Sequence, residues 1–324
     1  MFLITGGAGF IGSNLVAALS ARGEEVMVSD RLRDGPKWRN LRGSVIAGIV
    51  PPADLPRWLD GAPKLQAIIH LGAVSATTVT DGDLVADSNL NLTLSLWDWC
   101  ARNETRLIYA SSAATYGSGD QGFDDNADPH ALSRLRPLNL YGWSKHATDR
   151  RIAQILALNG TAPPQWAGLK FFNVYGPHEA HKGRMASVVL HKWRQIAAGE
   201  PATLFASDHP DYADGGQLRD FVHVDDCVNA MLFLLDHPEV SGLFNVGSGR
   251  ARSFADLARA IYAARQQPPD IRYVSMPDDL RGKYQYFTEA RMDRLRTAGF
   301  AHPPTELEAG VASYVRWLEA NQEA

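Results

Sequence analysis

Short apolar runs alternate with helically spaced apolar residues over the first half of the chain. The run 2–5 is a short apolar stretch, and the apolar residues after it recur every three or four positions, at 11, 15, 16 and 19. Continuous apolar runs are typical of buried parallel strands, and the wider spacing is typical of amphipathic helices. The repeated pattern predicts a parallel α/β sheet, with further strands at 25–30, 45–49, 66–71, 106–110 and 169–174 and helices at 54–59, 84–102 and from 141 onward.

Three glycines follow the first strand at the spacing of a dinucleotide-binding turn. Gly6 suits a tight turn, Gly9 lets backbone N–H groups approach a pyrophosphate, and Gly12 lets the next helix pack closely. Asp30 ends the second strand, at the interval expected for the carboxylate that binds the adenosine ribose. Glycine-rich turns also have purely structural uses, but the turn and the acid together predict a mononucleotide-binding unit with phosphates at the helix N-terminus.

The regular alternation ends after the sixth strand. Later strands are predicted at 202–205, 244–249 and 271–277, and helices at 188–198, after 226, after 253, and near 289 and 307. Such a break is typical of a second, smaller lobe. We expect a Rossmann-type doubly wound parallel sheet with a smaller C-terminal α/β substrate lobe. Residues 1–176 would form the NAD(P)-binding domain, and 177–324 mainly the substrate lobe, with some segments returning to the first domain.

Composition narrows the class of protein. The 324 residues are 45% hydrophobic and 21% charged, as in an ordinary globular enzyme, and the net charge of −4 gives no reason to expect nucleic acid. No apolar run approaches the ~18 residues that span a bilayer, so we expect a cytoplasmic protein with no membrane partner. Cys100 and Cys227 lie in helical apolar patterns that favour reduced packing residues, and the histidines lack metal-site spacing, so no metal is expected.

Tyr141 and Lys145 are the first candidates for chemistry. Residues i and i+4 share one helix face, so a lysine cation there would favour the phenolate and make the tyrosine usable as an acid or base. Ser112 follows the strand 106–110, at the sheet edge where ligands gather in open α/β folds. An ordinary amphipathic helix is the alternative, but the dinucleotide turn upstream favours catalysis.

The type of cofactor depends on the loop after Asp30. A carboxylate favours the free 2′-hydroxyl of NAD, whereas Arg31, Arg33 and Lys37 could hold the 2′-phosphate of NADP; a solvated charged loop is the third interpretation. Three cations around one predicted phosphate site favour NADP, with NAD possible. Small residues let a ribose and pyrophosphate approach the backbone after the fourth strand, at Leu71, Gly72 and Ala73.

Three other side chains have two interpretations each. Asn89 could face the cofactor or be a surface amide. Lys182 precedes the helix 188–198 and has the spacing of a mobile surface lysine. Arg219 could bind a diphosphate or form a salt bridge with Asp220.

Several motifs together resemble the extended short-chain dehydrogenase/reductase family, which includes NAD-dependent epimerases and dehydratases: 6–12, Ser112, Tyr141 with Lys145, 173–177, 219–226 and 244–249. The similarity runs from end to end of the chain. It implies a Rossmann domain, a C-terminal substrate lobe, and a tightly held nicotinamide cofactor used to modify nucleotide-linked sugars.

A narrower set of segments, 34–37, 111–117, 176–187 and 283–288, is similar to the heptose 6-epimerase branch of that family. This similarity implies ADP-heptose or a related nucleotide-sugar as substrate, epimerised at C6″ by transient oxidation with bound NADP. It implies that Lys182 is a second base opposite Tyr141, and that the protein is a homo-oligomer, a pentamer by resemblance. Another nucleotide-sugar epimerase, of the UDP-hexose 4-epimerase type with NAD, is the alternative.

Spacing and resemblance together assign residues to three roles. The catalytic residues are Tyr141, Lys182, Lys145 and Ser112. The cofactor-binding residues are Gly6, Gly9, Phe10, Ile11, Gly12, Asp30, Arg31, Lys37, Leu71, Gly72, Ala73, Val74, Ser75, Asn89, Lys145, Val174 and Lys182. The substrate-binding residues are Ser112, Asn173, Arg184, His191, Phe205, Ala206, Ser207, Asp208, Arg219 and Tyr284.

The chain departs from this branch at several positions. Gly48 replaces an acid and Pro51 and Pro52 replace a lysine on the adenine side, and Val79 replaces a glutamate. Arg184 replaces a small hydroxyl residue, and the loop 208–217 is longer. These changes could mean a modified sugar or nucleotide.

Other functions of the fold fit less well. Ala113 and Ala114 stand where dehydratases of the family need an acid, which argues against elimination. A cofactor-sensing protein without catalysis could dispense with Tyr141 and Lys145, and both are present.

Overall fold

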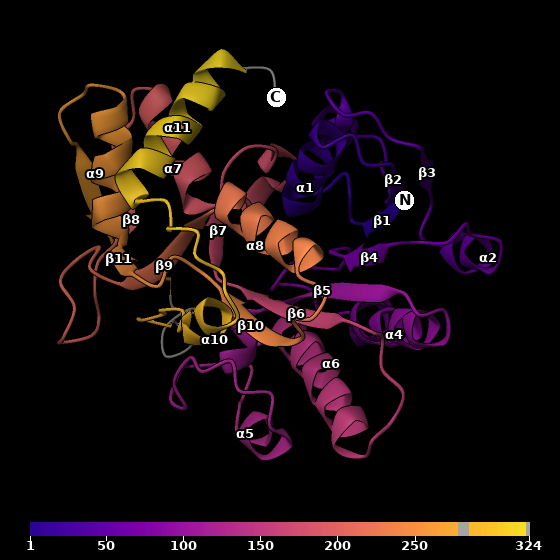
Figure 1. Cartoon of the computed structure of the whole chain (residues 1–324). Coiled ribbons are helices and arrows are strands. Elements are labelled where there is room, and N and C mark those ends of the chain that lie inside the picture. The colour runs from indigo at the N-terminus through magenta and orange to yellow at the C-terminus, as the bar shows by residue number, and fades with distance from the viewer. Residues whose placement is uncertain (278–284, 322–324) are drawn as a thin grey trace.

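The structure is a computed structural model that describes residues 1–277 and 285–321. Within them lies a seven-stranded parallel sheet of order β10-β6-β5-β4-β1-β2-β3 (Figure 1). Because β1 pairs with both β2 and β4, the strand order reverses there, where doubly wound sheets bind ligands. The predicted Rossmann-type fold is confirmed, with strands β1 Phe2–Thr5, β2 Val26–Ser29, β3 Gly48–Val50, β4 Ala67–His70, β5 Arg106–Ser112, β6 Trp166–Phe171 and β10 Gly242–Val246.

Helices cover both faces of this sheet. Figure 1 shows α1 and α8 on one face and α4 and α6 on the other. Buried apolar side chains of strands and helices form the first hydrophobic core between them. The helical elements of this part are α1 Phe10–Ala21, η1 Pro36–Leu41, α2 Leu55–Asp60, α3 Gly82–Val85, η2 Ala86–Asn91, α4 Leu92–Arg102, η3 Ala113–Tyr116, α5 Pro129–Ser133, α6 Leu140–Ala157 and α8 Val224–Asp236.

A second lobe packs beside the sheet around its own hydrophobic core. Its sheets are β11-β9-β7 and the parallel pair β12-β8. Helices α9 and α11 pack against each other, and α7 packs on α9. The elements are β7 Asn173–Tyr175, η4 Ala180–Met185, α7 Val188–Ala197, β8 Ala202–Phe205, β9 Leu218–His223, β11 Ala251–Ser253, α9 Phe254–Ala264, β12 Ile271–Val274 and α11 Leu307–Ala320. Helix α10 Asp293–Thr297 instead packs against β10, and its Leu295 belongs to the first core.

The chain passes between the two lobes more than once. The predicted strand 169–174 is two strands, since β6 ends at Phe171 in the large sheet and β7 begins at Asn173 in the small one. Strand β10 then returns to the edge of the large sheet beside β6, and α8 packs against α1. The division at 176 stays a prediction.

Several predicted elements differ from the structure. The helix predicted at 84–102 is interrupted, because α3 and α4 are joined by the π-helical turn η2. The strand predicted at 45–49 is β3, which starts at Gly48, and Val45 is 82% exposed. The helix predicted near 289 begins at Asp293.

Cys100 and Cys227 are free and buried, in agreement with a packing role. Among the described residues, none of the helices combines the length and the apolar character needed to cross a membrane. Residues 1–277 and 285–321 contain no group of three His, Cys, Asp or Glu that could hold a metal ion.

Candidate active site

The turn after β1 has backbone geometry that requires glycine. Gly6 has a φ of 69°, and a Cβ there would lie 2.6 Å from the backbone nitrogen of Gly72. A Cβ at Gly12 would lie 2.2 Å from the carbonyl oxygen of Gly6, so α1 packs directly on the turn. Gly9 caps α1 without a side chain, and the first turn of α1 contains no acidic residue. The positive end of α1 can therefore receive an anionic group such as a pyrophosphate.

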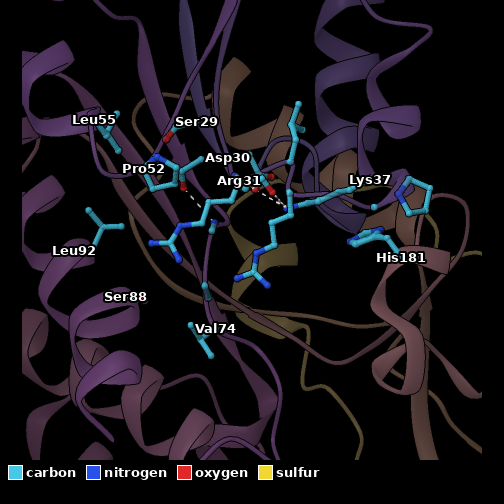
Figure 2. A pocket seen from close by; sticks show the side chains of 18 residues that line it. Ser29, Asp30, Arg31, Lys37, Pro52, Leu55, Val74, Ser88, Leu92 and His181 are labelled. Carbon is cyan, nitrogen blue, oxygen red and sulfur yellow. Dashed lines mark hydrogen bonds and ion pairs between the residues drawn. The ribbon is translucent and has the colours of Figure 1, made fainter. Parts of the chain in front are cut away.

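Two adjoining cavities, of about 400 and 350 Å³, open beside this turn. The first extends along the loop after β2 to Pro52 and Leu55 (Figure 2). The second contains Ser112, Tyr141, Lys145 and Lys182. The cavities share walls, so together they form one elongated site, with Gly6, Asp30, Lys37, Gly72, Ala73 and His181 in common. Every predicted cofactor-binding residue except Asn89 lines one or both of them.

The Asp30 carboxylate lines both cavities, and three donors hold it. Figure 2 shows Asp30 with two of these donor residues, Arg31 and Lys37. The backbone N–H groups of Ala8 and Arg31 donate at 2.9 and 2.6 Å, and the Lys37 ammonium donates at 2.5 Å. Arg31 and Arg33 line the same cavity. The carboxylate that would bind a 2′-hydroxyl is thus already paired with a cation.

The structure contradicts one of the two interpretations of Asn89, the surface amide. Asn89 is fully buried rather than on the surface. Its amide exchanges hydrogen bonds with the backbone N–H and C=O of Val74 at 2.8 and 2.9 Å, and donates to the Ser144 hydroxyl at 3.0 Å. Val74 lines the first cavity. Asn89 therefore fixes the backbone of the cavity wall, and the π-helical turn η2 brings it there.

Helix α6 begins directly against the turn that carries Ser112. Asn139 caps the helix by accepting from the Gly142 N–H at 2.8 Å. A Cβ at Gly142 would lie 2.7 Å from the carbonyl oxygen of Ala114, so the close approach depends on glycine. This contact sets Tyr141 beside Ser112 in the second cavity.

The ionisation of Tyr141 differs from the prediction. Burial raises the pKa of the Tyr141 phenol above its ordinary value, and a hydrogen bond from Ser112 lowers it by less. Burial also lowers the pKa of Lys145 to about 8, against the opposing effect of the Asp149 carboxylate. The predicted shift toward a phenolate is therefore wrong for the protein alone, because desolvation of the phenol is the largest effect on its pKa.

Lys182 lies in η4 and lines the second cavity with Tyr141. It is only partly exposed, unlike a mobile surface lysine. Burial lowers the pKa of its ammonium group, and Glu179 opposes that change. His178 and Gly183 have φ angles of 73° and 55°, so the backbone turns sharply on both sides of the lysine.

The segment around Lys182 is anchored at several points. The buried Glu179 carboxylate accepts from the N–H and hydroxyl of Ser187 at 2.5 and 2.6 Å. Asn14 of α1 donates to the Pro177 carbonyl at 3.0 Å, and Asn40 of η1 donates to the His178 carbonyl at 3.2 Å. The lysine is thereby tied to the helix and loop that form the cofactor cavities.

Among the described substrate candidates, only Ser112 lines either cavity, and it lines the second. Nε2 of His191 lies 3.3 Å from the Arg184 carbonyl oxygen, so these two residues are neighbours. Ser207 donates its N–H to Asp214 at 2.8 Å. The remaining candidates include Phe205 and Ala206 at the end of β8, Asp208, which accepts from the Tyr286 hydroxyl, and the exposed Asn173; Tyr284 lies outside the described residues.

Arg219 is buried in β9 and lies over the Phe254 ring, 5.7 Å from its centroid. It donates to the Leu218 carbonyl at 2.8 Å. The Asp220 carboxylate accepts from Ser248, Gly249 and Ala290. The Asp220 carboxylate therefore holds the loop at 248–249 and the backbone at 290 in place. For Arg219, the diphosphate contact and the salt bridge with Asp220 both stay predictions.

His181 is a cavity residue that sequence reasoning did not single out. It lines both cavities, and its Nδ1 lies 3.2 Å from the Asn40 amide nitrogen. Burial and the nearby cations Lys37 and Lys182 lower its pKa to about 4. Its position next to Lys182 in the sequence could have marked His181 as a candidate cavity residue. The other missed wall residues, which no motif marks, include Ser29, Leu55, Ser88, Leu92, Phe171 and Phe172.

Comparisons with known proteins show what the whole chain is similar to. Residues 2–247 match the model of the NAD dependent epimerase/dehydratase family. An ADP-L-glycero-D-manno-heptose-6-epimerase of Nitratidesulfovibrio vulgaris is 47% identical over 98% of this chain and 97% of its own. The Helicobacter pylori enzyme of that name has a TM-score of 0.80, with 29% identity over 98% of this chain and 96% of that one. Thermus thermophilus UDP-glucose 4-epimerase, solved with NAD, has a TM-score of 0.77, with 27% identity over 98% of both chains.

Proposed function

Since the chain belongs to the NAD dependent epimerase/dehydratase family, we propose that it interconverts ADP-D-glycero-D-manno-heptose and ADP-L-glycero-D-manno-heptose at C6″. The observation that carries this proposal is the presence of Tyr141 and Lys182 in one cavity beside the glycine turn. The 47% identical relative, similar over nearly its whole length, supports the choice of substrate.

The site residues fit a nicotinamide dinucleotide. A Cβ would fill the turn at Gly6 and Gly12, and α1 presents its uncapped end to the cavities. A bound nicotinamide would supply reversible hydride transfer at C6″, which would allow the sugar to exist briefly as a carbonyl compound. A cofactor of this kind is common to the family. We propose NADP in particular, supported by the Lys37 cation on Asp30 and by Arg31 in the same cavity.

In the proposed mechanism, Tyr141 and Lys182 carry the proton transfers. One of them removes the proton from the C6″ hydroxyl as C6″ is oxidised, and one of them returns a proton to that oxygen as C6″ is reduced. Rotation about the C5″–C6″ bond between these steps exposes the other face of the carbonyl. Two bases are useful because the two epimers point their hydroxyls in opposite directions.

Ser112 and Lys145 support Tyr141 in this mechanism. The Ser112 hydrogen bond favours the phenolate, and Lys145 stands one helical turn away in the same cavity. The cationic form of Lys145 also favours the phenolate, to the extent that burial allows it to stay protonated.

The remaining parts of the proposal concern the substrate and the assembly. We propose that Asn173, Arg184, His191, Arg219, Tyr284 and the segment 205–208 bind the nucleotide-sugar. We also propose a cytoplasmic homo-oligomer, a pentamer by resemblance. Light scattering of the purified protein would test the oligomeric state directly.

A labelling experiment tests the hydride step. The substrate carries deuterium at C6″, and the product epimer is examined by mass spectrometry. Return of the same hydride predicts that the label is kept. Loss of the label to water would contradict the oxidation mechanism, since only proton removal from carbon exchanges it with solvent.

A further inference from the structure

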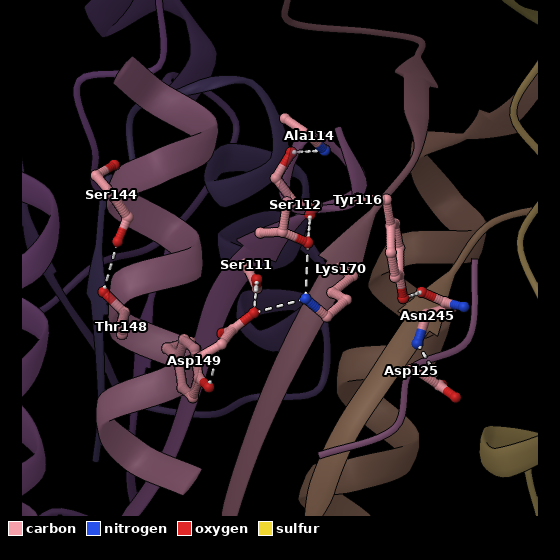
Figure 3. A network of polar contacts seen from close by, with 12 residues as sticks. Ser111, Ser112, Ala114, Tyr116, Asp125, Ser144, Thr148, Asp149, Lys170 and Asn245 are labelled. Atoms are coloured by element: carbon pink, nitrogen blue, oxygen red, sulfur yellow. Dashed lines mark hydrogen bonds and ion pairs between the residues drawn. The ribbon is translucent and has the colours of Figure 1, made fainter. Parts of the chain in front are cut away.

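A fully buried ion pair lies next to the end of β5, which carries Ser111 and Ser112. The Lys170 ammonium of β6 contacts the Asp149 carboxylate of α6 at 2.6 Å, and both side chains are 0% exposed (Figure 3). Neither residue lines the two cavities or belongs to the motifs that assigned the site. The function proposed above therefore leaves both charges unused.

Each member of the pair also binds the end of β5 or the turn after it. Asp149 accepts from the Tyr109 hydroxyl at 3.1 Å and from the Ser111 hydroxyl at 2.7 Å. Lys170 donates to the Thr115 hydroxyl at 2.7 Å. The pair thus holds together β5, η3, α6 and β6, as the dashed contacts in Figure 3 show.

These contacts lead directly to the candidate catalytic residues. The Thr115 hydroxyl donates in turn to the Ser112 carbonyl oxygen at 2.8 Å. Asp149 lies on α6 one turn beyond Lys145 and about two turns beyond Tyr141. One end of the network therefore holds the backbone of Ser112, and the other end holds the helix of Tyr141 and Lys145.

Stability alone does not account for such a pair. A buried salt bridge is often no more stabilising than apolar residues of similar volume, because both charges lose their water. Its contacts with fixed donors and acceptors specify geometry instead. We propose that Asp149 and Lys170 are positioning residues that set the Ser112 turn against the Tyr141–Lys145 helix. This inference rests on the proposed function of those three residues.

The charge of Asp149 adds a second effect that geometry alone would not have. The titratable groups that the pair faces are Tyr109, Tyr116, Lys145 and His146. Asp149 raises the pKa of Lys145 against burial. Loss of the carboxylate should therefore lower the pKa of Lys145 further and reduce its positive charge at neutral pH.

The test uses a double variant, Asp149→Asn with Lys170→Met. It removes both charges and keeps an amide for the Tyr109 and Ser111 hydroxyls, so no unpaired charge stays buried. The matched control, Asp236→Asn with Arg22→Met, removes an exposed ion pair whose side chains are 55% and 42% accessible. We expect the interior variant to fold and bind NADP, with kcat reduced about 10- to 100-fold and KM changed much less. The control should keep wild-type kcat.

Two further measurements can contradict the positioning role. The pKa of Lys145, followed by NMR of labelled lysine, should fall in the interior variant without any substrate present. Thr115→Val breaks the link to Ser112 while both charges stay paired, so it should fold and lower kcat even if the double variant does not fold. Wild-type kcat in Thr115→Val, or an unchanged Lys145 pKa together with wild-type kcat in the double variant, overturns the positioning role. A wild-type protein that binds NADP but epimerises nothing contradicts the proposed function instead, and the Lys145 pKa then decides the positioning proposal alone.

Discussion

The Lys182 ammonium nitrogen lies 5.3 Å from the centroid of the Phe10 ring. Phe10 is the first residue of α1, directly after the glycine turn, whereas Lys182 comes from the segment that follows β7. An aromatic face attracts a cation without neutralising its charge, whereas a carboxylate would neutralise it. The first residue of α1 therefore helps to position the second proposed base.

Lys182→Met should remove one of the two proposed bases. General acid–base catalysis contributes about 10²- to 10⁴-fold, so we expect kcat for epimerisation to fall within that range. Lys192→Met, on α7 outside the two cavities, is the matched control and should leave kcat unchanged. Full activity of Lys182→Met at saturating NADP would show that a single base suffices.

The free energy of unfolding should depend on pH because Lys145 is buried. Its folded pKa of about 8 lies below the ordinary lysine value, so folding favours the neutral form. Between about pH 8 and 10 the unfolded state binds more protons, and the contribution of Lys145 to stability rises with pH. Below pH 8, Lys145 is protonated in both the folded and the unfolded state, and its burial as a cation destabilises the folded state by the full amount.

Lys145→Met isolates this effect. In urea unfolding at pH 7, 8.5 and 10, the free energy of unfolding of Lys145→Met should exceed that of the wild type most at pH 7. That difference should shrink by about 1.4 kcal/mol for each pH unit in the upper range. Parallel stability curves for the two proteins would mean that Lys145 has an ordinary pKa in the folded state.

Lys37→Ala should change the choice of cofactor. Removal of the cation leaves the Asp30 carboxylate free to bind a ribose 2′-hydroxyl and to repel a 2′-phosphate. We expect the ratio of NADP to NAD affinity to fall about tenfold or more, as loss of a charge-assisted contact implies. The exposed Lys64→Ala is the control. Calorimetric titration of cofactor-free protein measures both affinities, and an unchanged ratio would exclude a role for Lys37 in the preference.

Gly12→Ala should weaken both folding and cofactor binding. The new Cβ would lie 2.2 Å from the Gly6 carbonyl oxygen, which is backbone and can move only with the turn. Overpacking of this kind costs about 1–3 kcal/mol. At Gly43 a Cβ would meet open space, so Gly43→Ala serves as the control. Equal melting temperatures and NADP affinities for the two variants would contradict the packing argument.

Local patterns were sufficient to locate the glycine turn and most strands of the large sheet, and to put Tyr141 and Lys145 on one helix, while the roles of these two side chains stay predictions. The glycines stand at fixed spacing, and the i and i+4 positions of a helix need no knowledge of distant contacts. Lys182 was different: its spacing indicated a surface lysine, and only the family resemblance marked it.

Features that depend on tertiary contacts were not predictable in this way. Asn89 is buried because η2 turns it toward Val74 and Ser144, and the helical pattern of 84–102 does not show that interruption. The pKa of Tyr141 depends on its burial, which spacing does not report. The sequence around Phe172 does not predict that the chain changes sheets there, because β6 and the start of β7 belong to one apolar run.

Epimerisation of an ADP-heptose can be observed directly. The purified protein, with bound nicotinamide cofactor confirmed, is incubated with ADP-D-glycero-β-D-manno-heptose and followed by proton NMR. We expect an equilibrium mixture of the two 6″ epimers. No interconversion with the cofactor bound would contradict the proposed function and direct attention to a different nucleotide-sugar, with Arg184 and the loop 208–217 as the places where specificity differs.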